Sequence, residues 1–472
     1  RSLGSFLLSE ARNGKDDKMQ IKKRSLSIIA IVCAIYAALN PFDFTATQVI
    51  LSTALIAGIS LWATAAIDKS ITSIALLSIF ILVGKNAPTE IIGFIWSDTA
   101  LLIMATSLLS VGITRTGLVE KLVGKILEKT GYKLNVLLVL PYILGIVLIF
   151  LIPQAFARSV ILTRFFYNIL SDDKKYSKTK PVLLFNVFWA VSITYMLFSN
   201  GDIVLNQSAI SFGGQMATAE LYFGNWTPHM FVPTLILCVI TFFLTKLIFR
   251  KELAEFDADM IVFSKQEKEI EGKKTGIPTI LMLVVIFLWM TVGVHGISEW
   301  LVALVAVIIM YAIKILTKED LKEINPRFII FLTAAFSIGK VMGANGISQV
   351  IFDYLQAIIP PGDSPFFLLA LALVTMVLHV LIGSAVATLS VVLPLFIPLG
   401  LASGYSVAVI VLLNYIVVNI HFLLPHHHAN MMIGVGKGYY DDKIMFKNGI
   451  VMMPVTFLVL ALLYIPWWNF IG

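Results

Sequence analysis

Apolar stretches separated by short polar segments recur along the whole chain. In the first half they begin near Ser25, Ala46, Ile71 and Asp98, each roughly 15–22 residues long, close to the ~20 that a helix needs to cross a bilayer. This pattern predicts an all-α polytopic membrane protein with about 11 spans. The later predicted spans begin near Pro181, His229, Ile277, Ser298, Arg327 and Lys447.

Two segments between the spans have a different pattern. Within residues 115–133, Leu118, Leu122 and Ile126 fall on one helical face, and lysines fall on another. This predicts an amphipathic helix on the membrane surface. A second surface segment is predicted at residues 346–359, after the span from Arg327.

Two apolar stretches contain a polar tip. Residues 134–170 are interrupted at Pro153-Gln154, and residues 366–401 are interrupted at Ser384. Lipid cannot satisfy the backbone groups that a break releases, so breaks survive where protein buries them or where they line a wet cavity. Each stretch therefore predicts two half-length helices in a re-entrant hairpin.

Two longer spans are broken near their middle. The span from Pro181 is broken by Ser-Asn-Gly-Asp at residues 199–202, and residues 405–435 are broken by Pro-His-His-His-Ala-Asn from Pro425. Polar residues at membrane depth are costly and usually functional. Both breaks are therefore candidates for a functional site.

The second half of the chain repeats the first. The hairpin tips at Pro153 and Ser384 are 231 positions apart, and the asparagines of the two broken spans, Asn200 and Asn430, are 230 positions apart. An odd number of predicted crossings separates equivalent spans, so the halves have opposite topology. Inverted repeats with paired broken helices are typical of secondary transporters, whose site lies between the repeats near the midplane.

Composition agrees with this class. The chain has 472 residues, of which 58% are hydrophobic and only 13% charged, with a mean hydropathy of +0.90, which excludes an ordinary soluble domain. Cys33 and Cys238 both lie in apolar segments, so no disulfide framework is expected. The lysines and arginines behind the net charge of +7 lie mainly in the predicted loops between spans, so this charge does not indicate a nucleic-acid partner.

The placement of lysine and arginine predicts the orientation. Nearly all of them fall in loops on one side of the predicted topology, as the positive-inside rule requires. We therefore expect an integral protein of the plasma (inner) membrane with the N-terminus cytoplasmic and the C-terminus outside. The basic loops are residues 115–133, 174–180, 250–274, 314–322 and 437–447, together with Lys69.

Two groups of motifs resemble a known family. SDTAL from Ser97 and GITRTGL from Gly112 resemble the span before the first hairpin of the divalent anion/sodium symporter family, the carriers of citrate, succinate and sulfate. LPHHHAN from Leu424 and GVGKGY from Gly434 resemble the proline- and asparagine-containing loop of that family. The resemblance implies a scaffold domain, a mobile transport domain, a homodimer and an elevator mechanism in the lipid bilayer, acting on a small anionic substrate.

The repeat and the resemblance together predict a division into domains. Each repeat contributes a scaffold part and a transport-domain part, and a cytoplasmic linker joins the repeats. The predicted parts are residues 1–24, a vector-derived remnant ahead of Met19 with a cytoplasmic N-terminal segment; 25–133 and 276–364, scaffold; 134–250 and 365–472, transport domain; and 251–275, linker.

The hairpin tips depart from the family pattern. The family carries Ser-Asn-Thr triplets there, whose oxygens bind sodium and substrate carboxylates, whereas this chain has Pro153-Gln154-Ala155 and Ser384-Ala385-Val386. Sodium is a hard ion that requires several oxygen ligands. We therefore expect transport that is not strictly sodium-coupled, with sodium or a proton as the coupling ion and no other cofactor.

Arg158 lies in the second arm of the first predicted hairpin. A buried charge costs roughly 3 kcal/mol or more at membrane depth, so it should face protein or a wet cavity. One interpretation is a fixed cation that stands where the family uses sodium and pairs with the substrate anion. The other is a structural ion pair, for instance with Asp202, or a side chain that reaches the inner surface.

The three adjacent histidines allow several interpretations. Histidine changes charge near neutral pH, which suits substrate or proton binding by at least one of His426, His427 and His428. Three consecutive residues rarely converge on a metal, so no metal site is expected. Alternatively, one faces the cavity and the others bond loop carbonyls. His379 and His421 are interpreted as structural or interfacial.

The candidate residues form two sets. Side-chain amides such as those of Asn200 and Asn430 can orient a carboxylate, and the half-helix N-termini at the tips favour anions. The predicted substrate-binding residues are Gln154, Arg158, Asn200, Ser384, Thr388, His426, His427, His428 and Asn430. The predicted ion- or proton-coupling residues are Pro153, Ala155, Ser199, Gly201, Asp202, Ala385, Val386 and Pro425.

Three functions remain open from the sequence. The leading one is an elevator-type transporter of a (di)carboxylate-like anion that works by proton symport, exchange or uniport. The second is a cation/proton antiporter of the same superfamily, against which Arg158 argues. The third is a membrane-embedded enzyme that uses the histidines. The repeat disfavours the enzyme, which needs no second broken helix, and we assign no catalytic residue.

Overall fold

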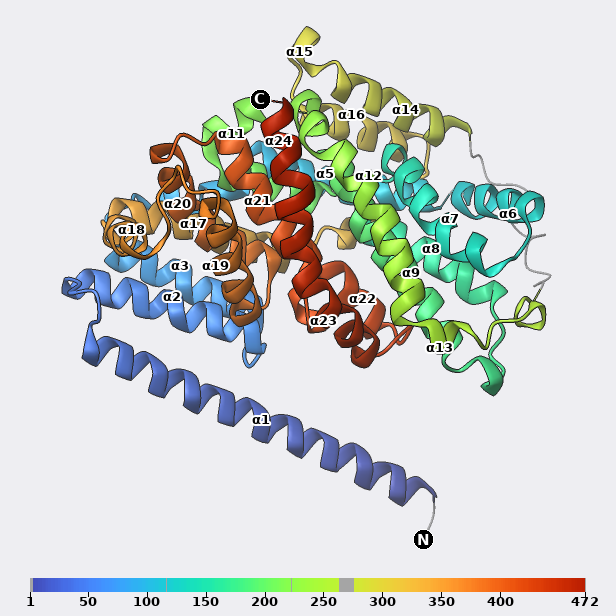
Figure 1. Cartoon of the computed structure of the whole chain (residues 1–472), viewed down its shortest axis with the longest axis horizontal. Helices are drawn as coiled ribbons and strands as arrows, with labels where there is room; N and C mark the ends of the chain where they lie inside the picture. Colours follow the sequence, from blue (N-terminus) through green and yellow to red (C-terminus); the bar gives the residue numbers. More distant parts are fainter. Residues whose placement is uncertain (1–2, 116, 222, 263–275, 472) are drawn as a thin grey trace. The chain divides into compact units, whose positions relative to one another are not determined.

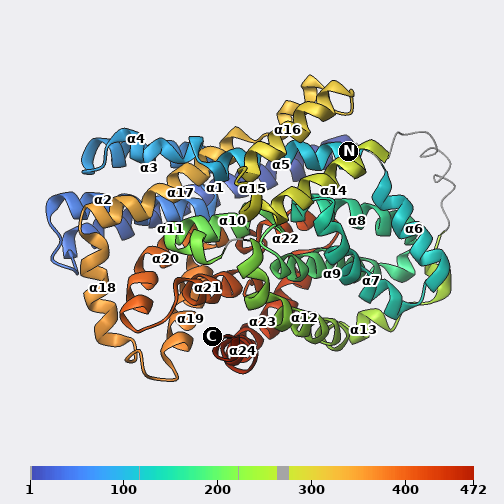
Figure 2. The same cartoon turned by 90° about the horizontal axis from the view of Figure 1, so that it is seen from above.

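The regular elements of the described residues are all helices. The computed structural model describes residues 3–115, 117–221, 223–262 and 276–471 (Figure 1 and Figure 2). Within these ranges, a single antiparallel bridge between Leu170 and Ile261 is the only extended pairing. The chain divides into two compact units. Residues 1 and 2, and 263–275 of the predicted linker, lie outside the described residues.

Unit 1 joins residues 1–95 to residues 326–358. Helix α3 packs against both α2 and α17, and the ring of Trp62 on α2 meets that of Phe331 on α17 edge-on, with 4.9 Å between centroids. Helix α1 includes the span that the pattern places from Ser25. The helices of unit 1 are α1 (Leu3–Leu39), α2 (Ala46–Thr64), α3 (Lys69–Val83), α4 (Pro88–Ile92), α17 (Pro326–Ala344) and α18 (Ile347–Ile358).

Unit 2 joins residues 96–325 to residues 359–472. Its first part contains the predicted surface helix as α6, in which Val123 and Leu127 are buried and Lys125 is exposed. The helices of this part are α5 (Asp98–Thr114), α6 (Leu118–Thr130), α7 (Leu134–Val147), α8 (Ala155–Ile169), α9 (Thr179–Thr194), α10 (Ile203–Phe212), α11 (Gly214–Glu220), α12 (Phe223–Ile248), α13 (Arg250–Leu253), α14 (Gly276–Met290), α15 (Val292–His295) and α16 (Glu299–Ala312).

The second part of unit 2 follows α18 in the sequence. Its helices α19 and α20 both pack on α21, as α7 and α8 both pack on α9 (Figure 2). All residues of α21 except Val409, and all residues of α9 except Pro181, are buried, so these two helices form the core of the unit. The helices of this part are α19 (Phe367–Ile382), α20 (Ala385–Ala402), α21 (Val407–Ile420), α22 (Ala429–Gly436), α23 (Asp442–Val459) and α24 (Ile465–Ile471).

The structure interrupts the helices at the four predicted places. The first tip separates the 3-10 turn η2 (Leu148–Phe150) from α8, and the second separates α19 from α20. The first break separates the 3-10 turn η4 (Tyr195–Leu197) from α10, and the second separates α21 from α22, with the short turn η8 (Pro425–His427) between them. The polar residues and prolines at these positions therefore predicted the interruptions correctly.

Seven helical segments among the described residues are long and apolar enough to cross a membrane. Seven shorter apolar helices accompany them, among them α3 and one helix next to each tip and break. Short helices of this kind are what interrupted spans produce. The long segments are 46–64, 88–114, 179–197, 225–248, 318–344, 385–402 and 442–471.

Candidate functional site

The first tip and the first break are held together by Arg158. Its side chain, on α8, is fully buried, and Nη1 donates to the carbonyl oxygen of Ile152 at 2.5 Å. Nη2 donates to the carbonyl oxygen of Gly201. The amide of Ile203 also donates to the carbonyl of Pro153 at 3.2 Å. Through these bonds the two interruptions of the first half form one local structure.

The guanidinium therefore binds backbone carbonyls rather than a side-chain carboxylate. Asp202, the ion-pair partner that the sequence suggested, caps α10 instead, with Oδ1 3.3 Å from the amide of Val204. Within the described part of the chain, Nε of Arg158 has no hydrogen-bond partner. Carbonyls left over where a helix ends need donors, and a buried arginine supplies several at once.

Polar groups without partners gather at the same place. Gln154 precedes the first residue of α8 without capping it through its side chain, and its Nε2 donates to Oγ of Ser107 on α5 at 2.7 Å. Both amide atoms of Asn200 are buried and have no partner among the described residues, and the same holds for Oε1 of Gln154. Buried polar groups are rarely left unpaired, so each such atom is a candidate for a bound ligand or water.

The second tip is built differently. The carbonyl of Ser384 accepts from the amide of Thr388 at 2.8 Å and from its hydroxyl at 2.9 Å. Oγ1 of Thr388 lies 3.0 Å from Nδ1 of His379 on α19. Ala385 and Val386 are buried in the first turn of α20. This tip therefore presents few side-chain oxygens, as its sequence indicates.

The three adjacent histidines have three different environments. His428 caps α22, with Nδ1 3.4 Å from the amide of Met431, and its Nε2 lies 3.2 Å from the hydroxyl of Tyr195. His427 is buried, and its Nδ1 accepts from the amide of Leu423 at 3.2 Å. His426 is half-buried and packs against the second tip. The loop therefore does not present three equivalent ligands.

The two asparagines that match in sequence differ in their bonding. Nδ2 of Asn430 lies 2.9 Å from Oγ of Ser159 on α8 and 2.8 Å from Oγ of Ser192 on α9. Asn430 therefore joins the second break to α8 and α9. The side-chain amide of Asn200, in contrast, has no partner among the described residues. Ser199 is also buried at the first break, and Pro425 begins the turn η8.

Several residues outside the predicted set hold this site together. Ser107, Ser159, Ser192 and Tyr195 all bond predicted site residues. Their shared signal is a hydroxyl inside an apolar helix. Serines and threonines that bond the carbonyl four residues back give the same signal, so it does not single out these positions.

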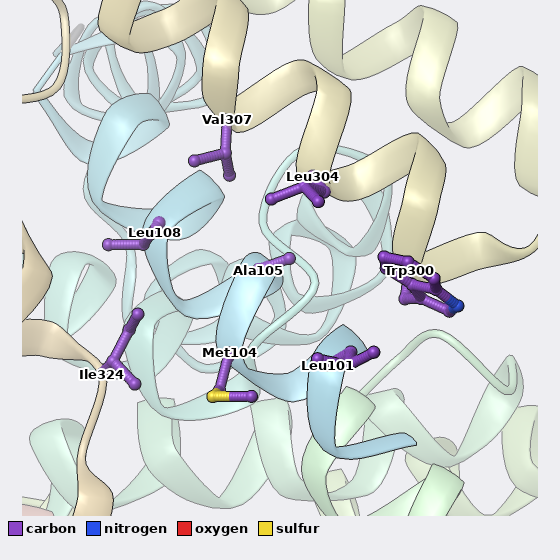
Figure 3. Close-up of a pocket in the computed structure, with 8 residues that line it drawn as sticks. All are labelled: Leu101, Met104, Ala105, Leu108, Trp300, Leu304, Val307 and Ile324. Carbon is purple, nitrogen blue, oxygen red and sulfur yellow. The ribbon is translucent and has the colours of Figure 1, made fainter. Parts of the chain in front are cut away.

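A separate pocket lies between α5, α16 and the segment before Asn325 (Figure 3). It has a volume of about 170 Å³, and none of the predicted site residues lines it. An anion needs polar or charged donors, which these apolar side chains do not supply. The lining residues are Leu101, Met104, Ala105, Leu108, Trp300, Leu304, Val307 and Ile324.

The tips and breaks combine helix N-termini with a buried cation. No three histidine, cysteine or carboxylate side chains in the described ranges converge on a metal position. Four helices, α8, α10, α20 and α22, begin at the tips and breaks, and a helix N-terminus carries a partial positive charge. The buried guanidinium of Arg158 adds a full positive charge.

Broken helices around buried polar groups, in a chain with many membrane-spanning segments, define an integral membrane transporter with a small-molecule substrate. A sequence model described as the sodium:sulfate symporter transmembrane region matches residues 19–472. The chain belongs to the sodium:sulfate symporter family, as the motifs at the spans and the second break indicated.

A solved structure shows a similar fold. It is the crystal structure of the YdaH transporter of Alcanivorax borkumensis, which is described as having an unusual topology. The TM-score is 0.52 with 16% sequence identity, over 81% of this chain and 88% of that chain. The likeness concerns the fold alone. None of the curated sequences compared with the chain matches it.

Proposed function

We propose that this protein carries a small (di)carboxylate-like anion by an elevator mechanism without a strict requirement for sodium. It works as a homodimer in the plasma (inner) membrane, with the N-terminus cytoplasmic and the C-terminus outside. The observation that carries this proposal is the buried guanidinium of Arg158, bonded to the carbonyls of Ile152 and Gly201.

Backbone carbonyls at broken helices are typical ligands of a coupling cation in transporters. Here the carbonyls of Ile152 and Gly201 already have a cation, which is covalently attached to α8. Ala155, Ala385 and Val386 offer no side-chain oxygen as a replacement. A tethered cation cannot leave with the substrate, so the positive charge that the site needs does not depend on sodium in solution.

Three further features support an anionic substrate. The N-termini of α8 and α10 begin beside Arg158. The free amide of Asn200, at the same break, can donate two hydrogen bonds to a carboxylate. Gln154 stands at the start of α8, where its amide is already oriented by Ser107. Together they supply positive charge and donors without competing carboxylates, apart from Asp202, whose carboxylate is bonded to the start of α10.

The elevator mechanism rests on the division of the chain. Each compact unit combines segments from both halves of the sequence, as a scaffold and a moving body built from inverted repeats would. The predicted scaffold, residues 25–133 and 276–364, is larger than unit 1, because α5, α6, α14 and α16 belong to unit 2. Helix α5 is hydrogen-bonded to Gln154 at the start of α8, and its Thr99 is bonded to Ser211 of α10. These bonds give a physical reason why α5 belongs to unit 2.

The direct test is uptake into proteoliposomes with sodium or potassium as the only cation. Labelled succinate, citrate and sulfate serve as probes. We expect uptake of at least one probe at closely similar rates in the two salts. A steep, saturable sodium requirement would overturn the proposal. Cation-driven proton movement without uptake of any probe would favour the cation/proton antiporter instead.

A second test removes the tethered cation. Arg158→Ala exposes the carbonyls of Ile152 and Gly201, so we expect sodium to raise the unfolding temperature of this variant more than potassium does. Arg164→Ala, an exposed arginine on the same helix, is the matched control and should show no such difference. Equal responses of the two variants to sodium and potassium would show that Arg158 does not occupy a cation-binding position.

A further inference from the structure

Four buried histidine nitrogens beneath the second tip have no role in the bonding described above. His379 comes from α19, His421 from the end of α21 and His427 from the turn η8. Their exposed fractions are 0%, 0% and 1%. The ring centroids of His379 and His421 are 6.2 Å apart, and those of His379 and His427 are 5.5 Å apart. Among the described residues, Nε2 of each ring and Nδ1 of His421 have no partner.

The hydrogen bonds of two of these rings fix where their protons lie. Thr388 gives its hydroxyl hydrogen to the carbonyl of Ser384, so Nδ1 of His379 must donate to Thr388. In the neutral ring, Nε2 of His379 is then a free lone pair. Nδ1 of His427 accepts from the amide of Leu423, so the neutral ring of His427 carries its hydrogen on Nε2.

These assignments give the cluster an open position for one proton. Nε2 of His379 can accept a proton, and His421 has a second free lone pair within the same cluster. The three rings do not bond one another, so a proton that binds one ring is held there while the neighbouring rings stay neutral. Two protons would place two positive charges about 6 Å apart in a buried site, which is unfavourable. The cluster is therefore built to hold a single added proton.

Helices α19 and α20 carry no charged residue, and α21 carries none either, its Tyr415 being bonded to Asn206. The helices packed on α21 carry Glu220, whose carboxylate accepts from the amide of Ala408 at the opposite end of α21 from His421, and Lys180, which donates to the carbonyl of Leu170. The charged residues of α23 are in its first turns, where Lys447 pairs with Glu252. The remaining titratable neighbours are His426, which packs on Gly383, and His428, which is bonded on both sides.

The cluster is connected to the second tip by two contacts. His379 bonds Thr388, which bonds the carbonyl of Ser384 at the tip itself. The ring of His426 lies against Gly383, which has a φ of +66° and has no room for a side chain beside that ring. The ring centroid of His426 is 4.6 Å from that of His427. A charge added to the cluster therefore acts directly on the residues that form the tip.

The geometry points to a proton-binding site formed by His379, His421 and His427, through which one proton is coupled to the second tip. Thr388, the partner of His379, follows Arg158 by 230 positions, the same separation as between Asn200 and Asn430. The first tip thus has a permanent cation, and the second has one that forms only when a proton binds. This coupling deepens the proposed function and rests on it, whereas proton binding itself does not.

Nitrogen NMR of the full-length protein labelled in its histidines tests proton binding without any substrate. We expect one signal of the cluster to change to the doubly protonated form as the pH is lowered from about 8 to about 4. His379→Gln, in which an amide can still donate to Thr388, should abolish that transition. His295→Gln, at a histidine bonded to Leu288 and Ile297 and outside the cluster, should retain it. A transition that persists in His379→Gln and His421→Gln would overturn the proposal.

Uptake of succinate, citrate and sulfate into proteoliposomes tests the coupling. An inward acid gradient should change the initial rate of the parent several-fold, and His379→Gln should give the same rate with and without the gradient. Parent uptake that ignores the gradient would overturn the coupling, while the proposed anion transport would stand. No uptake of any probe would count against the proposed function and against the coupling that rests on it, and the NMR result would still decide the proton site.

Discussion

Nδ2 of Asn430 lies 2.9 Å from Oγ of Ser159, so the second break is hydrogen-bonded to the second arm of the first hairpin. The same amide lies 2.8 Å from Oγ of Ser192. Asn430→Ala removes both bonds in a buried site, so we expect a loss of about 1–3 kcal/mol of unfolding free energy. Unfolding of the purified protein in detergent measures it, and an unchanged unfolding curve would show that this junction contributes little.

Asn200→Ala is expected to affect ligand binding more than stability. The amide of Asn200 is buried without a partner in the described part of the chain, so its removal costs no hydrogen bond within the protein. We expect a smaller loss of unfolding free energy than for Asn430→Ala, because the truncation removes packed atoms but no hydrogen bond. Stabilisation by succinate, citrate or sulfate in a thermal-shift assay should be lost. Retained stabilisation would place the substrate elsewhere.

The interruptions of the helices were predictable because proline and polar residues stand out in apolar sequence. The bonding of Asn200 and Asn430 was not, since it depends on which helices face each break. The sequence pattern predicts the two residues to be equivalent, yet only Asn430 contacts hydroxyl groups, from Ser159 and Ser192. A repeat predicts equivalent positions in the chain, and it does not predict equivalent neighbours.

Arg158 and the histidines show the same limit. The sequence indicated a buried charge at Arg158 and suggested Asp202 as one partner, whereas the structure directs the guanidinium to two carbonyls. Backbone acceptors leave no mark on residue type, so no pattern could have named them. His379 and His421 come from different segments and meet only in the folded chain, which is why the sequence alone suggested a structural or interfacial interpretation for each.

Gly201 occupies a position where no side chain fits. A Cβ there would overlap the carbonyl of Tyr195 and lie 2.9 Å from the carbonyl oxygen of Phe198. Both are backbone groups that cannot rotate away, so we expect Gly201→Ala to cost about 1–3 kcal/mol and to weaken the bond from Arg158. Gly436→Ala, at the open end of α22, is the matched control and should be neutral. Equal stability of the two variants would contradict this packing.

Asp257 makes the stability depend on pH through its contacts with Lys175 and Tyr176. The hydrogen bonds from Lys175 and Tyr176 hold the pKa of the Asp257 carboxyl below its usual value. A carboxyl with a lowered pKa stabilises the fold above its unfolded pKa, about 4, and this contribution is lost as pH falls through the folded value. Asp257→Asn should therefore unfold at a lower temperature than the parent near neutral pH.

The difference between Asp257→Asn and the parent should shrink as the pH falls below about 4. Unfolding temperatures of both proteins over that range measure it. Asp259→Asn, an exposed carboxylate two residues further on, is the control. A gap of the same size at neutral and acidic pH would show that the charge of Asp257 is not the cause.

Arg115 and Asp320 form an ion pair with unequal burial, which makes the order of the variant effects testable. Both terminal nitrogens of Arg115 bond the carboxylate, whose side chain is 6% exposed, whereas the arginine side chain is 42% exposed. Arg115→Met leaves a buried carboxylate with only Thr317 to bond it, while Asp320→Asn leaves a guanidinium that water can reach.

An unpaired buried charge costs more than an unpaired exposed one. We therefore expect a loss of about 1–3 kcal/mol for Arg115→Met, reduced from the fully buried case by solvent screening, and a smaller loss for Asp320→Asn. The double variant should resemble Asp320→Asn, because it no longer contains the buried charge. Unfolding of the three variants in detergent decides the order, and a larger loss for Asp320→Asn than for Arg115→Met would show that the buried carboxylate is not the costly partner.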